Sequence, residues 1–337
     1  MRVLLVAGVD PTRPGGLETH VRELARALAA RGHEIAMHGP WRLPPFPSVA
    51  DIVPARHDIV HHHGGAWPGN IPTGAWYVRT LHWCTAAKVA TYVRLGRVQT
   101  LANPGNWAAL AEERATVRRA GRLIAVSDRL RREFAHWYRV DPARVRVIPN
   151  GVRVEPPARD RAAVRAAWSV APEAPVLLTI GRADFVKGWA LLERAWRRAA
   201  LPRGAVWVSV GGHAPQRTGD RLVTGPQPHA EVADWIAAAD LGALPSWYEG
   251  CGVALLEMLA GGLYTLAHDV GIAPEVVRPG ASGELVAPDE SAWAAALARL
   301  LASPPPRGPG LPPGFTWDAV AEAVEQEYRA ALAGVRL

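Results

Sequence analysis

The sequence is poor in cysteine and in lysine. Its 337 residues include two cysteines, Cys84 and Cys251, which are too few for the disulfide framework of a small secreted domain, so a reducing cytoplasm is the expected compartment. Two of the 38 basic residues are lysines, Lys88 and Lys187. Where arginine fills nearly every basic position, a remaining lysine can mark a place that needs a compact ammonium group. Lys187 is therefore a candidate functional residue.

Long apolar runs, a leader pattern and the dinucleotide fingerprint are also missing. No run reaches about 18 apolar residues, so no transmembrane helix is expected. Residues 1–8 have no cleavage region of a signal peptide and are better explained as a first strand. A nicotinamide-binding domain would show G-x-G-x-x-G after the first strand and an acidic residue after the second. The loop has only Gly15-Gly16, and the second strand ends in Met37-His38-Gly39, so a nicotinamide oxidoreductase is not expected.

The positive charge is concentrated in the first half of the chain. The net charge of +7 comes from 22 basic and 12 acidic residues over 1–155, and from 16 basic and 19 acidic residues over 156–337. A basic half could meet anionic lipid headgroups, a phosphate-bearing acceptor or nucleic acid, although a preference for arginine codons would give the same excess. The 14 tryptophans are scattered and not interleaved with basic residues, so nucleic-acid binding is not expected.

Short apolar runs alternate with helical patterns along most of the chain. The length suits two domains or one large one, and this alternation predicts an α/β fold in which ligands bind at the carboxyl ends of buried parallel strands. Strands are expected at 3–9, 34–38, 58–64, 76–81, 122–126, 145–152, 176–180, 205–210, 221–224, 239–244 and 263–267. Helices are expected at 17–31, 104–120, 130–138, 161–168, 189–200, 229–238, 253–260 and 317–332. The glycines that end the strands 205–210 and 221–224 would suit backbone contacts to a nucleobase.

The stretch 244–262 holds two acidic residues around the start of a helix. Glu249 lies in the loop after an apolar strand and Glu257 inside the following helix, with Gly250-Cys251-Gly252 and Val253 between them. The free N–H groups of a helix start, next to glycines without side chains, let a ligand approach the backbone closely. Carboxylates only accept hydrogen bonds, which suits a ligand rich in hydroxyl groups, such as a sugar or a ribose. A surface helix with two solvated acids would show the same spacing.

A second loop, 181–188, carries Arg182 and Lys187 after the strand 176–180. A guanidinium fork and an ammonium in one such loop can converge on a pyrophosphate and neutralise the charge that develops on a departing nucleoside diphosphate. A solvated basic loop is the alternative. The loop with Gly15-Gly16, before the helix 17–31, is a further candidate anion site, or else a simple turn.

Histidines follow two of the predicted strands in the first half. His61, His62 and His63 are adjacent, but alternate side chains of a strand point to opposite faces, so only His61 and His63 could share a ligand. Because two histidines rarely suffice for a metal site, no metal is expected there. His82 follows the strand 76–81, where it either faces a ligand or packs in the core.

Together these motifs resemble the retaining glycosyltransferases of family GT4. The similarity covers nearly the whole chain and rests on the E-x7-E motif of Glu249 and Glu257, the Gly15-Gly16 opening, the Arg182 and Lys187 loop, and the A-V-S-D and V-I-P-N-G-V patterns. It implies the GT-B fold, with two Rossmann-like doubly wound domains and the active site in the cleft between them. The acceptor-side domain would be 1–155, the nucleotide-sugar-binding domain 156–316, and the helix of 317–337 would pack back on the first domain, after a stiff linker at 303–314.

The resemblance also implies the functional residues. As catalytic residues it points to His82, Glu249, Arg182 and Lys187. As substrate-binding residues it points to Gly15, Gly16, Arg182, Lys187, Glu249, Gly250, Cys251, Gly252, Val253 and Glu257. In these roles Glu249 would hold hydroxyls of the transferred sugar, Glu257 would accept from the ribose diol, and His82 would face donor sugar and acceptor.

The implied reaction moves a sugar, with retention, from a UDP- or GDP-linked donor to a hydroxyl acceptor that could be lipid-linked, in bacterial glycan or glycolipid synthesis. No cofactor or divalent metal is implied, and the D-x-D motif of metal-dependent transferases of the other major fold is absent. The enzyme would be cytoplasmic and could attach to the anionic inner face of the plasma membrane.

The chain departs from the family pattern at Cys251, Tyr264-Thr265 and Gly271-Ile272, which bears on donor or acceptor preference. A nucleotide-sugar 2-epimerase or phosphorylase on the same fold, or a non-catalytic sugar- or polyanion-binding module, are the alternatives.

Overall fold

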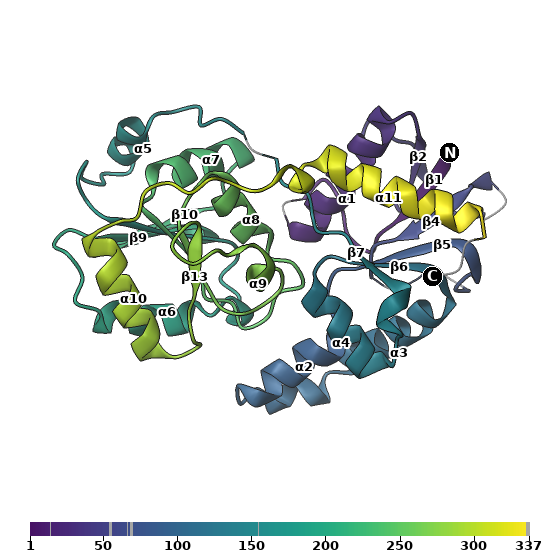
Figure 1. Ribbon diagram of the computed structural model, residues 1–337, viewed down its shortest axis with the longest axis horizontal. Helices are drawn as coiled ribbons and strands as arrows, with labels where there is room; N and C mark the ends of the chain where they lie inside the picture. Colours follow the sequence, from purple (N-terminus) through teal and green to yellow (C-terminus); the bar gives the residue numbers. More distant parts are fainter. Residues whose placement is uncertain (14, 54–55, 66, 68–69, 154, 335–337) are drawn as a thin grey trace. The chain divides into compact units, whose positions relative to one another are not determined.

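Two parallel sheets, one in each of two compact units, organise the chain (Figure 1). The first unit consists of Met1–Gly151 and Pro313–Leu337, and the second is Val152–Pro312. The computed structural model describes all residues except 14, 54–55, 66, 68–69, 154 and 335–337. Among the described residues, none of the helices combines the length and the apolar character needed to span a bilayer.

The first sheet has the strand order β3-β2-β1-β4-β5-β6-β7. Its strands are β1 (Arg2–Val6), β2 (Glu34–His38), β3 (Ser48–Val49), β4 (Ile59–His62), β5 (Gly74–Leu81), β6 (Ala120–Ala125) and β7 (Val145–Val147). β1 pairs with β2 on one side and with β4 on the other, so the order reverses beside β1. In doubly wound sheets the loops at such a reversal diverge and leave room for a ligand. Every residue of β4 is buried, as expected for a strand covered on both faces.

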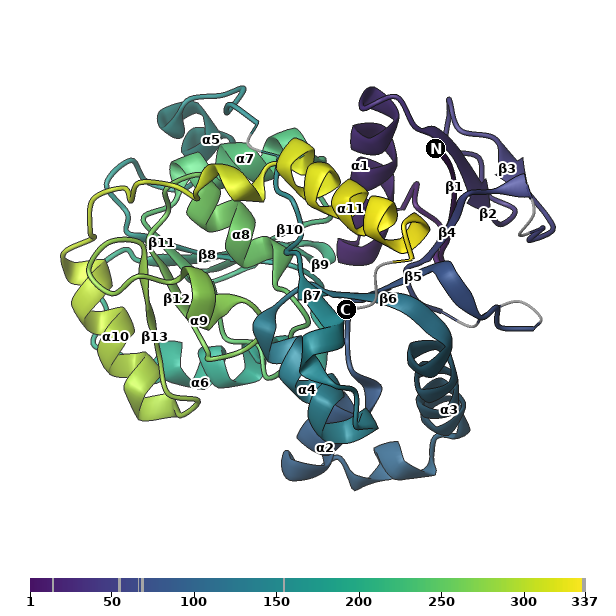
Figure 2. The same cartoon turned by 45° about the vertical axis from the view of Figure 1, so that its right-hand side comes forward.

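Helices cover both faces of this first sheet (Figures 1 and 2). They are α1 (Gly16–Ala30), α2 (Thr85–Arg94), α3 (Pro104–Arg119), α4 (Asp128–Tyr138) and α11 (Trp317–Leu332), with the short 3-10 turns η2 (Val98–Ala102), η3 (Pro142–Arg144) and η5 (Pro313–Phe315). Both figures show α11 (yellow) beside α1, and the two bury Leu24, Leu28, Val324 and Tyr328 in one core. The last helix of the chain is therefore part of the core of the first unit.

The second sheet has the strand order β10-β9-β8-β11-β12-β13. Its strands are β8 (Val176–Ile180), β9 (Val206–Thr218), β10 (Arg221–Gly225), β11 (Leu241–Leu244), β12 (Thr265–Ala267) and β13 (Gly283–Leu285). β8 pairs with β9 and with β11, so here the order reverses between β8 and β11. The loop after β8 is the cationic loop with Arg182 and Lys187, and the loop after β11 is the acidic loop with Glu249.

Helices also cover both faces of the second sheet. They are α5 (Arg161–Ala167), α6 (Trp189–Arg198), α7 (His229–Ala238), α8 (Val253–Ala260), α9 (Ala273–Val276) and α10 (Glu290–Ala302), with the turn η4 (Phe185–Lys187). One core gathers side chains of α5, α7 and α8, including Val164, Trp235 and Met258. A second core gathers α6 and α10 around Leu192 and Trp293. The doubly wound α/β architecture expected from the sequence is thus confirmed in both halves.

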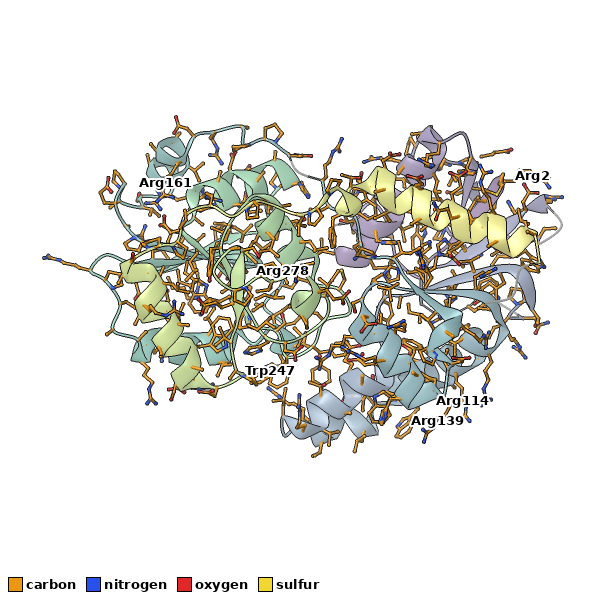
Figure 3. The ribbon with its side chains drawn as sticks, in the orientation of Figure 1. Arg2, Arg114, Arg139, Arg161, Trp247 and Arg278 are labelled. Atoms are coloured by element: carbon orange, nitrogen blue, oxygen red, sulfur yellow. The ribbon has the colours of Figure 1, made fainter. Side chains whose placement is uncertain are left out.

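An ion-pair network centred on Asp240 ties α5 to the second sheet. Arg161, labelled in Figure 3 at the start of α5, donates to Asp240 Oδ1 at 2.5 Å, and Arg165 Nη2 donates to Asp240 Oδ2 at 2.8 Å. The backbone N–H of Val176, the first residue of β8, donates to the same Oδ2 at 2.8 Å. The Arg165 side chain is 1% exposed, so its charge depends on Asp240 and on the carbonyl groups that also accept from it.

Most predicted elements are present, with several differences. The short strands β3 and β13 and the short helix α9 were not expected. β9 does not end at Gly211-Gly212, although both glycines adopt positive φ. It continues to Thr218 because the segment after the glycines pairs a second time with β10. The helices α2 and α10 do not follow from the patterns above, although α10 is rich in alanine and leucine, which favour helix. β1 also ends three residues earlier than the apolar run that predicted it.

Candidate active site

The candidate site of the second unit lies where the strand order of its sheet reverses. Lys187 is the last residue of η4, in the loop that follows β8. Ser246 and Glu249 lie in the loop that follows β11. Because β8 and β11 are neighbours in a parallel sheet, both loops leave the same edge.

Lys187 and Glu249 form an ion pair across these two loops. Lys187 Nζ lies 2.7 Å from Glu249 Oε1, and Ser246 Oγ donates to the same oxygen at 2.7 Å. The Lys187 and Glu249 side chains are 21% and 12% exposed, so the pair borders solvent. An ammonium has three donors and a carboxylate has two acceptor oxygens, so the paired groups retain capacity for a polar ligand. The sequence predicted both residues but assigned them to different parts of a donor, and it did not predict Ser246.

A close approach of two backbone segments holds the two loops together. Gly188 has φ of 68°, and a Cβ built on it would lie 1.8 Å from the carbonyl oxygen of Pro245. Beside it, the N–H of Trp247 donates to the carbonyl of Val186 at 2.7 Å. Only glycine fits this contact, which places Lys187 directly against the loop of Glu249.

His268 holds the loop of Ser246 and Glu249 through a hydrogen bond to its backbone. Its Nδ1 lies 2.9 Å from the carbonyl oxygen of Ser246, and Trp293 Nε1 donates to its Nε2 at 2.8 Å. These two partners require the tautomer with hydrogen on Nδ1, because a carbonyl can only accept and the indole can only donate. Burial lowers the pKa of His268, which keeps the ring neutral. The sequence analysis did not predict this residue, since its partners come from distant elements.

Glycines shape the start of α8. Gly252 has φ of 102° and precedes the first residue of α8, where no side chain caps the helix. A Cβ on Gly271 would lie 2.4 Å from the carbonyl oxygen of Cys251, and the N–H of Ile272 donates to that oxygen at 2.9 Å. The backbone at Gly271-Ile272 therefore supports the turn of Cys251, and the first N–H groups of α8 lie beside this turn.

Glu257 contributes to a pocket beside this helix. Its Oε1 lies 3.1 Å from Nε2 of His229, the first residue of α7. The pocket measures about 290 Å³ and is lined by Arg153, Glu155, Pro156, Pro157, His229, Val232, Ala233, Ile236, Ala237, Glu257, Ala260 and Gly261. The carboxylate of Glu257 can accept hydrogen bonds from hydroxyl groups of a ligand that packs against the apolar residues of this pocket.

Arg182 pairs with an acid of its own loop. Its side chain is 80% exposed, and its Nε lies 3.3 Å from Asp184 Oδ2. The convergence of Arg182 and Lys187 on a pyrophosphate stays a prediction. An exposed arginine on a loop can move toward a ligand at little cost.

In the first unit, the loops after β1, β4 and β5 bring histidines together. His82 follows β5, His63 follows β4, and His20 lies on α1. His63 Nδ1 is 3.3 Å from His82 Nε2, and the ring centroids of His20 and His82 are 4.5 Å apart. Burial, followed by the neighbouring histidines, lowers the pKa of His63 and of His82 well below the usual value. The predicted His82 is therefore a neutral, partly exposed imidazole in a histidine cluster.

The adjacent histidines His61 and His62 are engaged by different partners. His61 lies between Tyr328, 2.6 Å from its Nδ1, and Thr80, 2.7 Å from its Nε2. His62 accepts from Arg79 at 2.9 Å on Nδ1 and contacts the carbonyl of Gly65 through Nε2. The ring centroids of His61 and His63 lie 4.0 Å apart, as the alternation along a strand allows, but both nitrogens of His61 are engaged by Tyr328 and Thr80.

Gly15 and Gly16 begin α1 as predicted. A Cβ on Gly15 would fall 2.0 Å from Glu18 Oε2, so the carboxylate of the first helical turn lies against this glycine. A negative group at a helix N-terminus is favourable, and here the chain supplies one itself. The predicted anion site at this helix start stays a prediction.

Comparisons with known proteins agree with these observations. Residues 38–156 match a family model described as Glycosyltransferase Family 4, and residues 174–303 match one described as Glycosyl transferases group 1. The D-inositol 3-phosphate glycosyltransferase of Kineococcus radiotolerans is 31% identical over an alignment that covers 94% of this chain and 91% of the relative. The enzyme of the same name from Thermobispora bispora is 32% identical, with 95% and 83% covered.

Solved structures share the fold. Sucrose-phosphate synthase from Thermosynechococcus elongatus superposes with a TM-score of 0.77 at 22% identity, covering 99% of this chain and 100% of that one. Anabaena HepE in complex with UDP-glucose superposes with a TM-score of 0.69 at 16% identity, covering 99% and 100%. At these identities the likeness concerns the architecture, which is the GT-B fold of two Rossmann-like domains.

Proposed function

Since the chain belongs to glycosyltransferase family 4 and is a glycosyltransferase, we propose that it transfers a sugar, with retention, from a UDP-linked donor to a phosphate-bearing hydroxyl acceptor. A UDP donor is supported by the structural relative solved with UDP-glucose, and GDP is the other candidate nucleotide. The acceptor class is supported by relatives named for inositol 3-phosphate and by the basic excess over residues 1–155.

The observation that carries the proposal is the ion pair of Lys187 and Glu249. In the donor complex Lys187 and Arg182 face the diphosphate, and Glu249 accepts from hydroxyls of the transferred sugar. The N–H groups at Gly250 to Val253 add fixed donors. The ammonium of Lys187 lies 2.7 Å from the carboxylate of Glu249. This proximity suits a nucleotide-sugar, in which the phosphate that the ammonium would bind is bonded directly to the sugar that the carboxylate would bind.

Glu257 and His229 form the second part of the proposed donor site. Glu257 accepts from the ribose diol, and the pocket of about 290 Å³ next to it receives the nucleoside. We assign donor binding to the second unit. The first unit, with Gly15, Gly16 and His82, is assigned to the acceptor and to the transferred sugar.

The reaction breaks the bond between the anomeric carbon and the β-phosphate oxygen and forms a bond from that carbon to the acceptor oxygen. The acceptor proton passes to the departing phosphate on the same face of the sugar, so no protein nucleophile is required. The charge on the departing diphosphate is neutralised by Lys187, Arg182 and helix N–H groups, and we propose that no divalent metal is needed for transfer. His82 is neutral and can accept a hydrogen bond from the sugar or acceptor.

A donor screen followed by a transfer assay tests this function. UDP-, GDP-, dTDP- and ADP-sugars are compared by their effect on the melting temperature, because a ligand that binds only the native state stabilises it. The donor that raises the melting temperature is then supplied with and without inositol phosphate, and the anomeric configuration of the product is determined. Transfer that depends on the acceptor supports the proposal. Isomerisation of the donor without an acceptor would instead indicate an epimerase, and phosphorolysis would indicate a phosphorylase.

Variants of the ion pair test the site itself. Glu249→Ala is expected to lower kcat by about 100-fold or more, since it removes a contact to the reacting sugar. Glu290→Ala is the matched control, because this acid of α10 also pairs with basic residues but lies on the surface of the same unit. Wild-type turnover by Glu249→Ala would remove Glu249 from the mechanism.

We further propose that the first unit contacts an anionic membrane surface through η2 and the start of α3. Val98, Leu101 and Trp107 are exposed there by 60%, 45% and 57%, and Arg94 and Arg97 lie in the same segment. Exposed apolar side chains flanked by arginines suit the boundary between anionic headgroups and acyl chains. Sedimentation with phosphatidylglycerol vesicles should be lost in Trp107→Ser and weakened by salt. No sedimentation of the wild-type chain at low salt would refute this surface, and a lipid-linked acceptor would lose its support.

A further inference from the structure

Three histidines of the first unit meet at one point, and the proposed transfer reaction uses only one of them. His20 comes from α1, His63 from the residue after β4, and His82 from the residue after β5. One nitrogen from each ring lies within 4.8 Å of the others. The three elements adjoin the reversal of strand order beside β1, where loops of a doubly wound sheet diverge.

The hydrogen bond of His20 directs a lone pair into this cluster. His20 Nδ1 lies 2.9 Å from Asn150 Oδ1, and an amide oxygen accepts, so Nδ1 carries the hydrogen. The opposite nitrogen, Nε2, therefore has a lone pair, and it is buried without a hydrogen-bond partner among the described residues. A partner on the far nitrogen that fixes the tautomer is the arrangement found for histidines that bind metals.

His63 and His82 have the spacing of two ligands of one ion. His63 Nδ1 is 3.3 Å from His82 Nε2. Around a tetrahedral zinc ion with bonds of about 2.0–2.1 Å, ligand nitrogens are separated by about 3.3–3.4 Å. A cation can thus replace the single proton that the two rings now share. The nitrogen of His20 lies within 4.8 Å of the other two, so reaching this spacing takes an approach of at most about 1.5 Å.

The surroundings favour these three rings over the other histidines. His61 has both nitrogens engaged by Tyr328 and Thr80, and His62 has both engaged by Arg79, Tyr77 and Gly65. The positive charge of Arg79 is offset by Glu112, whose Oε1 lies 3.0 Å from Nη1.

We propose that His20, His63 and His82 form a binding site for one borderline transition cation, Zn²⁺ or Co²⁺, with His82 placing the fourth coordination position toward solvent. Three imidazoles and one open position are a ligand set that zinc accepts. The site is additional to the transfer reaction, which requires no metal. Because the cation takes the lone pair of His82, bound zinc is expected to inhibit transfer, and this consequence rests on the role proposed for His82.

Cobalt spectroscopy tests the site independently of any sugar. The full-length chain is stripped of metal and titrated with Co²⁺, whose visible absorption is intense in four-coordinate sites and weak in octahedral ones. We expect saturation at one equivalent, with displacement by Zn²⁺. His20→Gln and His63→Gln should each weaken binding by at least about 10- to 100-fold, whereas His136→Gln, at an exposed histidine of α4, should bind as wild type.

Two further measurements make the outcome decisive. Asn150→Ala leaves all three rings in place but removes the partner of His20, and it should also weaken cobalt binding by about 10-fold or more. Circular dichroism shows whether each variant folds. Weak octahedral spectra, or equal binding by His20→Gln, Asn150→Ala and His136→Gln, would refute the site. If cobalt binds as expected but wild-type protein transfers no sugar, the proposed function fails and the metal site stands; if zinc binds without inhibiting transfer, only the role of His82 fails.

Discussion

The contact of Gly188 with Pro245 makes a quantitative prediction about how the two site loops are held. In Gly188→Ala the new residue would keep φ of 68°, which costs an L-residue about 1–2 kcal/mol. Its Cβ would also lie 1.8 Å from the Pro245 carbonyl oxygen, so the loops must separate by more than about 1 Å. Overpacking that shifts backbone costs about 1–3 kcal/mol. The free energy of unfolding should therefore fall by about 2–5 kcal/mol.

Gly204 supplies the matched control in the same unit. It has φ of 81°, and a Cβ built on it meets no atom within 4 Å. Gly204→Ala should therefore show the cost of the backbone conformation alone, about 1–2 kcal/mol. Urea unfolding of the full-length variants, followed by circular dichroism, gives the difference between them. Equal midpoints for Gly188→Ala and Gly204→Ala would refute the idea that a close backbone contact locks the loops.

The same pair of variants links the contact to the site. Gly188 follows Lys187, so a displaced loop moves the ammonium away from Glu249. The affinity for the donor nucleotide, measured by isothermal titration at a temperature where both variants are folded, should fall by about 10-fold or more in Gly188→Ala. It should remain that of wild type in Gly204→Ala. Unchanged affinity in Gly188→Ala would show that the position of Lys187 does not depend on this contact.

Two further changes test charged groups that the fold buries. Asp240→Asn should destabilise the second unit by about 3–5 kcal/mol in urea unfolding, because it leaves the guanidinium of Arg165, 1% exposed, without its counter-charge; a loss below 1 kcal/mol would contradict this. In the first unit, hydrogen bonds from Arg329 and Arg31 lower the pKa of Glu325 to about 2. The stabilisation from these bonds is complete above the ordinary pKa of about 4.5 and is lost as the pH falls toward 2. Melting temperatures of wild type and Glu325→Gln should therefore differ at pH 6 and converge at low pH, and a difference independent of pH would refute the assignment.

Local patterns predict many elements of this chain, because a strand or helix with one buried face has apolar residues that recur at a regular spacing. β2, β8, α7, α8 and α11 have the bounds that their apolar spacing indicates. Each of the two loops that the sequence analysis singled out does follow a buried strand, β8 or β11. Their pairing through Lys187 and Glu249 could not be predicted from periodicity, because it depends on β8 and β11 being neighbours, which only the strand order shows.

The residues that the sequence analysis missed are those whose partners are far along the chain. His268 is fixed by Ser246 and Trp293, and neither partner leaves a local signal beside it. His20 did carry a signal, because it precedes Leu24 and Leu28 by four and eight residues and so lies on the buried stripe of α1. A polar residue on such a stripe needs a partner, and here that partner is Asn150.

The participation of α11 in the first core has a consequence for how the protein is made. The second unit, Val152–Pro312, is one continuous segment and can complete its core while the ribosome is still at work. The first unit cannot, because Val320, Val324 and Tyr328 are translated after the whole second unit and yet pack against α1 and β4. A nascent chain would therefore carry an open apolar face on α1 and β4 until α11 has left the ribosome. The unit whose strands are made before those of the second unit is completed only after it.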